Sequence, residues 1–331
     1  MDSMNQPETL QEAVLYFSNP DNCLNFVVSQ RWPNGVVCPK CGRADVVFLN
    51  NRRKWQCKST HDHRQFSVKV GTIFEDSPIG LDKWLVAMWM LANDKNGKSS
   101  YEVGRDIGVT QKSAWFMMHR IRKAFNTGSI EMMTGECEVD ETFIGGKARN
   151  MHIDVKKRRI TSSSGPGDKI AVMGILERGD ESKGTHSRVK TAVVPNRKKA
   201  TLQAEVKQHV QAGAALYSDF LLSYEGLASE YAHKVVDHAV EYVRGSVHTN
   251  GLENFWSLLK RGINGTYVSV EPFHLFRYLD EQMFRFNNRG NRDNPVTDFD
   301  RFRMAVSQVV GKRLTFDEVT GKTLRVETGT F

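Results

Sequence analysis

The chain has 331 residues, and its 46 Lys and Arg outnumber its 38 Asp and Glu by eight. An apolar content of 40% and a charged content of 25% exclude a disordered or fibrous chain. The longest charge-free run, residues 208–218, is too short for a membrane-spanning helix, which needs about 20 apolar residues. The N-terminus lacks the regions of a signal peptide, and the five cysteines are too unevenly spaced for a disulfide framework, so we expect a cytoplasmic protein with an anionic partner.

Turn-forming residues and changes of pattern divide the sequence into successive regions. Short helices are expected up to a Pro- and Gly-containing turn at residues 31–35. The regions that we predict are an N-terminal helical segment (1–35), a cysteine-bearing module (36–74), a helical module (75–130), an α/β domain (135–310) and a polar tail (311–331).

The cysteine-bearing module begins with a CxxC pair, Cys38 and Cys41, and farther along carries Cys57, His61 and His63. Two thiolates two residues apart can bind one side of a tetrahedral Zn²⁺, and a second pair of ligands must close the other side. Cys57 and His61 supply that pair, with His63 as the alternative fourth ligand. A redox role for the CxxC pair lacks a βαβ context. Three thiolates and one imidazole leave no open position, so the pattern predicts one structural zinc ion.

The helical module contains the pattern of a helix-turn-helix. Gly104 and Gly108 lie where this motif needs a small residue and then a residue that tolerates positive φ. Thr110 is the expected N-cap of the second helix, which buries a stripe that includes Met118 and Ile121. The alternative is a generic helical hairpin with a solvated basic face. The candidate DNA contacts on this helix are Gln111, Lys112, His119, Arg120 and Arg122.

The α/β domain shows three strand-like segments, a helical segment and a fourth strand, in that order. These segments are residues 138–146, 169–176, 189–194, about 200–210 and 214–219. This order predicts an RNase H-like mixed sheet, in which the first and fourth strands are neighbours. Asp140 in the first strand and Asp219 at the end of the fourth would then lie close together. Either residue alone fits a turn or capping role equally well.

A third acidic residue comes from a predicted helix over residues 248–261. Its buried stripe, with a period of 3.6 residues, is Leu252, Phe255, Trp256, Leu259 and Ile263. Glu253 and Lys260 lie nearly two turns apart on the neighbouring face. Asn250 and Glu253 also fit a capping box, in which Glu253 would only bond back to the start of the helix.

Three carboxylates together suit a particular chemistry. Oxygen ligands favour Mg²⁺ or Mn²⁺ over zinc. Two such ions about 4 Å apart can bind the attacking and the leaving oxygen of a phosphodiester, so no protein nucleophile is required. We therefore predict two catalytic Mg²⁺ or Mn²⁺ ions at Asp140, Asp219 and Glu253.

Basic residues are concentrated in two regions. Residues 146–200 contain 14 Lys and Arg against 5 Asp and Glu, and residues 81–127 contain 8 against 4. Any one basic run alone fits a solvated loop, but two such regions beside an acidic site favour polyphosphate binding. The further candidate DNA contacts are Lys156, Lys157, Arg158, Arg159, Arg197, Lys198, Lys260 and Arg261.

Four strings resemble the DDE transposases of bacterial insertion sequences: VDETFIGG, YSDF, HTNGLENFWSLLKRGINGTY and RYLDEQMFRFNNR. CPKCG and QFSVKVGTIFEDSPI are similar to the subgroup with an N-terminal zinc ribbon, so the resemblance extends from about Arg31 to Arg289. It implies that Asp140, Asp219 and Glu253 are the acidic triad and that Lys260 is the basic residue seven positions beyond. The chain departs from many relatives where a histidine replaces the second CxxC of the ribbon.

The resemblance implies a nucleoid-associated enzyme that binds terminal inverted repeats through its ribbon and helix-turn-helix. It would cleave double-stranded DNA at the element ends and join the 3′-hydroxyls to target DNA, as a homodimer or a larger synaptic assembly. One alternative is a zinc-ribbon/helix-turn-helix regulator whose RNase H-like domain does not catalyse. Another is an RNase H-like nuclease without strand transfer. The intact triad with Lys260 argues against the regulator, and the two N-terminal DNA-reading modules argue against the simple nuclease.

Overall fold

The computed structural model describes residues 6–126, 131–145, 169–180, 182, 184–219, 222–236, 248–291 and 294–322. The chain divides into two compact units, one made of residues 1–127 and 296–331 and the other of residues 128–295. Within the described ranges, no helix combines the length and the apolar character needed to cross a membrane.

The first unit is built around an aromatic core. Its helices α1 (Leu10–Phe17), α2 (Pro20–Arg31), α3 (Leu81–Asn93) and α10 (Asp298–Ser307) pack against one another. The rings of Phe26 and Phe302 stack with their centroids 5.3 Å apart, and Trp89 lies 5.2 Å from Phe302. Thr9 begins α1 with a complete capping box, and Asn19 caps α2.

The C-terminal part of the chain returns to this first unit. The sequence placed residues up to 310 in the α/β domain and predicted a separate polar tail beyond them. In the structure, α10 and α11 (Phe316–Val319) instead belong to the first unit. The reason is the apolar face of α10, where Phe299, Phe302, Ala305 and Val306 are buried. The backbone of Val309 adds a hydrogen bond from Ile73 N at 3.1 Å.

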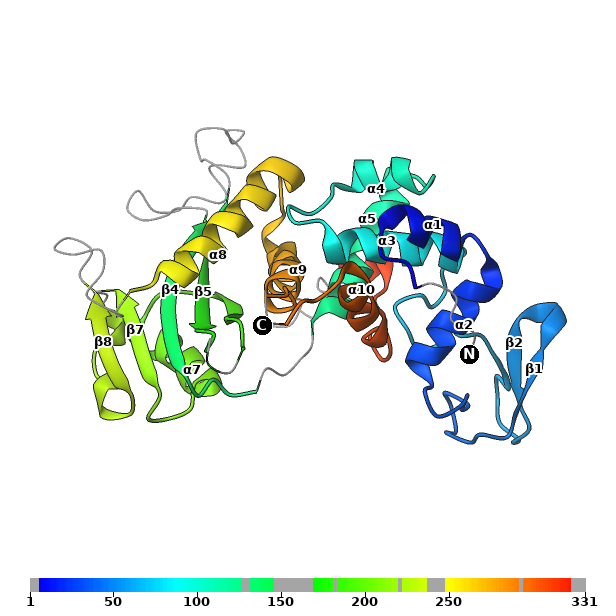
Figure 1. Ribbon diagram of the computed structural model, residues 1–331, viewed down its shortest axis with the longest axis horizontal. Coiled ribbons are helices and arrows are strands. Elements are labelled where there is room, and N and C mark those ends of the chain that lie inside the picture. Colours follow the sequence, from blue (N-terminus) through cyan, green and yellow to red (C-terminus); the bar gives the residue numbers. More distant parts are fainter. Residues whose placement is uncertain are drawn as a thin grey trace. The chain divides into compact units, whose positions relative to one another are not determined.

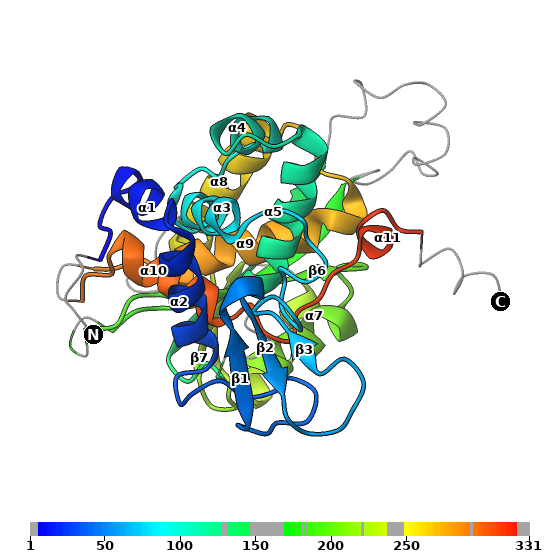
Figure 2. The same cartoon turned by 90° about the vertical axis from the view of Figure 1, so that its right-hand side faces the viewer.

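The cysteine-bearing module forms a small antiparallel sheet. Strands β1 (Val46–Leu49), β2 (Lys54–Cys57) and β3 (Gln65–Phe66) lie side by side in that order (Figure 2). Trp55 on the central strand packs against Trp32 and Phe66, with ring centroids 5.6 and 6.0 Å away. This small core and a four-residue cysteine and histidine cluster support a sheet too small to be stable by packing alone.

The two helices expected in the helical module are α4 (Ser100–Asp106) and α5 (Gln111–Phe125). A Cβ atom on Gly104 would lie 3.1 Å from the carbonyl oxygen of Val109, so the close approach there leaves little room for a side chain. Gly108 has a φ of 63°, and the Thr110 side chain accepts a hydrogen bond from Ser113 N at 3.2 Å. The predicted roles of these three residues are confirmed.

The second unit contains a mixed five-stranded sheet (Figure 1). Its strands are β4 (Glu136–Ile144), β5 (Ile170–Glu177), β6 (Arg188–Val194), β7 (Ala215–Asp219) and β8 (Ala232–Val236). Their order is β6-β5-β4-β7-β8, with β4, β7 and β8 parallel and the β4–β5 and β5–β6 pairs antiparallel. The predicted RNase H-like sheet is confirmed, including the adjacent first and fourth strands. The short edge strand β8 had no counterpart in the sequence prediction.

Helices cover both faces of this sheet. On one face, α7 (Lys199–His209) packs Leu202 and Val206 against Val139 and Ile175. On the other, α8 (Asn250–Arg261) and α9 (Leu275–Asn287) share a core with the opposite side of the strands, and Figure 1 shows α8 crossing β4 and β5. The predicted stripe on α8 is buried in full, and a π-helix (Gly262–Tyr267) continues it.

Candidate functional site

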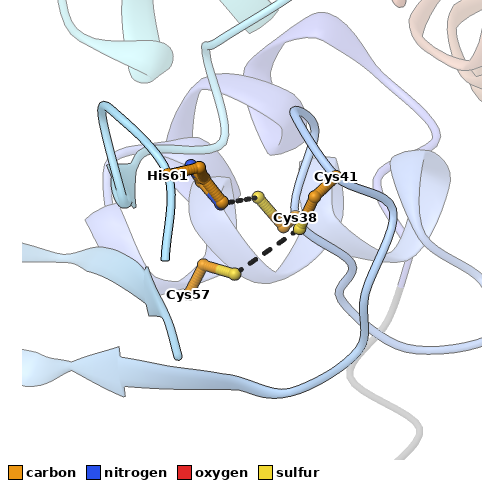
Figure 3. Close-up of side chains that lie close together, drawn as sticks. All are labelled: Cys38, Cys41, Cys57 and His61. Atoms are coloured by element: carbon orange, nitrogen blue, oxygen red, sulfur yellow. Dashed lines mark hydrogen bonds between the residues drawn. The ribbon is translucent and has the colours of Figure 1, made fainter. Parts of the chain in front are cut away.

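Four side chains of the cysteine-bearing module converge on one point, one from the end of β2 and three from the loops beside the sheet (Figure 3). The ligand atoms of Cys38, Cys41, Cys57 and His61 all lie within 4.8 Å of one another. Sγ of Cys38 is 3.5 Å from Nε2 of His61, and Sγ of Cys41 is 3.6 Å from Sγ of Cys57. Three thiols and one imidazole at these separations fit a tetrahedral structural zinc site with no open position. His61, rather than the neighbouring His63, is the histidine of this cluster.

Hydrogen bonds around the cluster favour the protonation states that bind a metal ion. Nδ1 of His61 lies 2.8 Å from the carbonyl oxygen of Asp62, so Nδ1 carries the proton and Nε2 is left to face the thiols. Burial raises the pKa of Cys57, but hydrogen bonds from the Ser59 amide and from His61 outweigh burial and lower that pKa to about 6. The thiolate is the form of cysteine that binds zinc, so a lowered pKa of Cys57 favours zinc binding.

The second site begins with the alternation of side chains along β4. Cys137 and Val139 point into the core beneath α7, whereas Ile144 belongs to the core beneath α8. Because successive residues of a strand point to opposite faces, Glu138 and Asp140 share the α8 face with Ile144. Each of these two acidic residues contacts α8.

Asp140 is held by two hydrogen bonds. The indole Nε1 of Trp256 on α8 donates to its Oδ2 at 2.9 Å, and the backbone amide of Glu141 donates to its Oδ1 at 2.7 Å. Trp256 can reach the strand because Gly174 lies directly opposite Asp140 on β5. A Cβ atom on Gly174 would lie only 2.6 Å from Cζ2 of Trp256.

Asp219 ends the neighbouring strand β7. In the parallel register the last paired residues are Val139 and Ser218. Asp140 and Asp219 are the next residues on the two strands, so they lie side by side. Leu216 lies in the core beneath α7, which places Asp219, three positions later, on the α8 face with Asp140. The sequence expectation that the first and fourth strands bring these two residues together is met by the register.

Glu253 and Lys260 lie on the exposed side of α8. The capping-box interpretation of Glu253 is wrong: α8 begins at Asn250, its N-cap is Thr249, and no side-chain cap hydrogen bond is formed. Glu253 is therefore not used to close the start of its helix.

The carboxylates interact electrostatically. Burial and then the negative charge of Asp219 raise the pKa of Asp140 to about 6, and the charge of Glu253 adds to the rise. Like charges held this close favour a bound cation. Within the residues that the structure describes, the cysteine and histidine cluster is the group whose ligand atoms lie close enough to hold a metal ion, and Asp140, Asp219 and Glu253 do not together form a second such group.

Other acidic residues at this site were missed from the sequence. Glu141 points to the α7 face, where the Tyr224 hydroxyl donates to it. Burial raises its pKa to about 7, and the charges of Asp219 and Asp140 contribute. Glu138 is only 1% exposed and binds Arg178 and the start of α8. Glu138 lies on the same face of β4 as Asp140, but no local pattern in the sequence pointed to it or to its partners.

The candidate DNA contacts of α5 divide into two groups. The expectation that one exposed basic face carries them all is wrong, because His119, Arg120 and Arg122 are buried. Arg120 donates to the Glu75 carbonyl oxygen and lies over the Phe116 ring, so it acts in packing. Gln111 is half-buried and donates to the Ser100 hydroxyl at 2.8 Å, whereas Lys112 is exposed.

The remaining basic candidates belong to the second unit. Arg197 and Lys198 precede α7 and are exposed, as are Lys260 and Arg261 at the end of α8. The guanidinium of Arg197 lies 4.8 Å from the centre of the Phe143 ring. The run at residues 156–159, which comprises Lys156, Lys157, Arg158 and Arg159, lies outside the described residues.

Comparisons with known proteins match both sites. Residues 132–287 match the ISXO2-like transposase domain, and residues 18–63 match the transposase zinc-ribbon domain. An uncharacterized protein in transposable element ISH50 of Halobacterium salinarum is 27% identical over 278 residues, which are 80% of this chain and 89% of that protein. An uncharacterized transposase-like protein of Haemophilus influenzae is 33% identical over 102 residues, 30% of this chain and 82% of that protein. No solved structure matches the chain.

Proposed function

The chain belongs to the ISXO2-like transposases, and from this we propose that it cleaves the DNA ends of its insertion sequence and joins the freed 3′-hydroxyls to target DNA. The observation that carries the proposal is the register of β4 and β7 beneath α8. It puts Asp140 and Asp219 side by side on the face that α8 covers, and α8 itself carries Glu253. The pKa of Asp140, raised by burial and by both other carboxylates, supports their proximity.

Asp140, Asp219 and Glu253 would hold two Mg²⁺ or Mn²⁺ ions, because all three offer the oxygen ligands that these hard cations prefer. When bound, such ions supply Lewis acidity to the attacking and the leaving oxygen of the phosphodiester. Trp256 fixes the orientation of the Asp140 carboxylate through its indole N–H. Lys260, exposed on α8 two turns beyond Glu253, is placed to bind a DNA phosphate.

We assign recognition of the terminal inverted repeats to the ribbon (36–74) and the helix-turn-helix module (75–130). Lys112 near the start of α5 is exposed and can reach DNA, as recognition helices do with their N-terminal residues. The exposed cations of the second unit, Arg197, Lys198, Lys260 and Arg261, are proposed contacts to the phosphate backbone near the cleavage site. Two ends must be held together for joining, so we propose a homodimer or a larger assembly on DNA.

The test is a cleavage and joining assay on a duplex that carries the element end, with Mg²⁺ or Mn²⁺. Asp140→Asn keeps an acceptor for Trp256 but removes the negative charge. We expect it to lose cleavage by at least about 100-fold while its affinity for end DNA stays within about twofold of wild type. Glu136→Gln on the same strand, at an exposed side chain, is the matched control and should cleave normally.

Each outcome of this assay separates the candidate functions. Cleavage followed by joining supports the transposase reaction. Cleavage without joining under any metal condition would instead indicate a nuclease. Binding of end DNA without metal-dependent cleavage by the wild-type chain would indicate a regulator. Cleavage retained by Asp140→Asn would remove Asp140 from the catalytic site.

A further inference from the structure

The start of α8 is bonded by a carboxylate from a distant strand, in addition to a local hydrogen bond from the Asn250 N–H to Nδ1 of His248 at 3.4 Å. Its N-cap residue, Thr249, makes no side-chain cap hydrogen bond. The backbone N–H of Leu252, the third residue of the helix, instead donates to Oε2 of Glu138 at 2.9 Å. Glu138 lies on β4, 114 residues earlier in the chain. A carboxylate at this position satisfies an otherwise unpaired helical N–H and interacts favourably with the helix dipole.

The second oxygen of Glu138 is bound by Arg178, which follows β5. Nε of Arg178 donates to Oε1 of Glu138 at 2.8 Å, and the Glu138 side chain is 1% exposed. The guanidinium also donates to Glu136 Oε2 at 3.1 Å and to the carbonyl oxygen of His248 at 2.8 Å. The guanidinium of Arg178 therefore connects β4, the end of β5 and the chain that enters α8.

His248 completes this contact through its side chain and its backbone. Its Nδ1 lies 2.9 Å from Nη2 of Arg178, and a guanidinium can only donate. Nδ1 is therefore the acceptor in this contact, as it is for the backbone N–H of Asn250 at 3.4 Å, and it also lies 3.5 Å from Oε1 of Glu138. His248 was a candidate for direct participation in catalysis together with His238, which lies outside the described residues. The contacts of His248 instead place it in the connection between Arg178 and α8.

The first turn of α8 lies in close contact with the sheet at Gly251. A Cβ atom on Gly251 would lie 2.8 Å from Oε2 of Glu138 and 3.1 Å from Cδ2 of Leu176. Only a glycine allows the backbone of α8 to approach the carboxylate this closely. The position of the first turn is thus set by direct contact with Glu138 and with β5.

A second attachment follows one helical turn later, where Trp256 donates to Asp140. Glu138 and Asp140 are separated by about 6.8 Å along a strand, and Leu252 and Trp256 by about 6 Å along a helix. The two spacings match, so both contacts form at once. Glu253, the third proposed ligand, lies between the two attachment points.

We propose that Glu138 is a positioning residue: together with Arg178 it fixes α8 at the height and rotation that bring Glu253 to Asp140 and Asp219. This inference rests on the proposed function. Glu138 is not itself offered as a metal ligand, because the Leu252 amide and Arg178 occupy its two oxygens. Its loss would leave the carboxylates of the catalytic site intact but misplace one of them.

Glu138→Gln tests the proposal in the full-length protein. The variant amide oxygen can still accept from the Leu252 N–H, but the amide NH₂ then faces the donors of Arg178. We expect the concentration of Mg²⁺ for half-maximal cleavage of end DNA to rise at least about tenfold, because loss of a residue that orients metal ligands typically costs about 10–100-fold in metal affinity. The thermal unfolding midpoint and metal-free binding of end DNA report whether the protein is folded.

Glu136→Gln is the matched control, since it makes the same change on the same strand to the other carboxylate partner of Arg178. Its side chain is 48% exposed, and we expect a wild-type Mg²⁺ requirement. Arg178→Lys is the second variant should Glu138→Gln not fold. It keeps the charge but loses the fork that bonds Glu138 and the carbonyl oxygen of His248 at the same time, so the Mg²⁺ requirement should rise here too.

A wild-type rate and Mg²⁺ requirement in folded Glu138→Gln, or in folded Arg178→Lys, would overturn the proposal. A folded Glu138→Gln protein that is inactive at every Mg²⁺ and Mn²⁺ concentration would also overturn it, because Glu138 would then act in the chemistry itself. Asp140→Asn distinguishes a failure of the proposed function from a failure of the positioning role. If Asp140→Asn cleaves normally, the proposed function fails. If it is inactive while Glu138→Gln behaves as wild type, only the positioning role fails.

Discussion

A single methyl group on the central sheet should displace the helix that carries Glu253. Gly174 lies opposite Asp140 on β5, beneath α8. In Gly174→Ala the new Cβ would lie 2.6 and 2.8 Å from Cζ2 and Cη2 of Trp256 and 2.9 Å from Cδ2 of Leu252. Trp256 is the residue that bonds Asp140, so the clash acts directly on the catalytic arrangement.

The size of the effect follows from these contacts. Two carbon atoms are at their optimal separation at about 3.5–4.0 Å, so the new contact is too short by about 1 Å. Both neighbours are buried and cannot swing into solvent. Overpacking of this kind costs about 1–3 kcal/mol of folding free energy. A shift of about 1 Å in Glu253 should lower the cleavage rate about 100-fold.

Urea unfolding and cleavage of end DNA at saturating Mg²⁺ measure the two effects. Gly135→Ala is the matched control, because its Cβ would lie no closer than 3.5 Å to Glu177 and its φ is not positive. We expect that control to stay within about 0.5 kcal/mol of wild type and to cleave normally. A Gly174→Ala protein with wild-type stability and rate would show that contact with Gly174 does not set the position of α8.

Two further predictions concern the first unit. Cys38→Ser should reduce the zinc content from one ion per chain to nearly none and weaken the binding of end DNA. The control Cys23→Ala changes a buried thiol outside the cluster and should keep its zinc. One bound zinc ion in Cys38→Ser would contradict the proposed ligand set. Thr110→Ala removes the acceptor for Ser113 N at the start of α5, so the free energy of unfolding in urea should fall by about 1 kcal/mol. An unchanged unfolding midpoint would show that this cap is not needed.

Several features could be predicted because they depend on local chemistry. Gly108 needs positive φ, and Thr110 caps the helix that directly follows it. Cys38 and Cys41 lie three positions apart in the chain, and this spacing together with Cys57 and His61 indicated a metal. The buried stripe of α8 followed from its period of 3.6 residues.

Predictions failed where burial depends on what packs against a surface. The basic side of α5 looked solvent-facing, yet His119, Arg120 and Arg122 are buried. Periodicity identifies a polar face of a helix but not whether another segment covers it. The same reason applies to α10, whose aromatic residues could have joined either unit and which packs with α2 and α3.

The sequence by itself determined the residue types of the zinc cluster, the order of strands and helices, and three acidic residues in a transposase-like pattern. Only the tertiary structure decided how α8 sits on the sheet. The position of α8 depends on Glu138, Arg178, Gly174 and Trp256, and their contacts join residues up to 116 positions apart in the chain. Contacts between such distant residues leave no periodic or spaced pattern in the sequence, because they are produced by strand register and close packing.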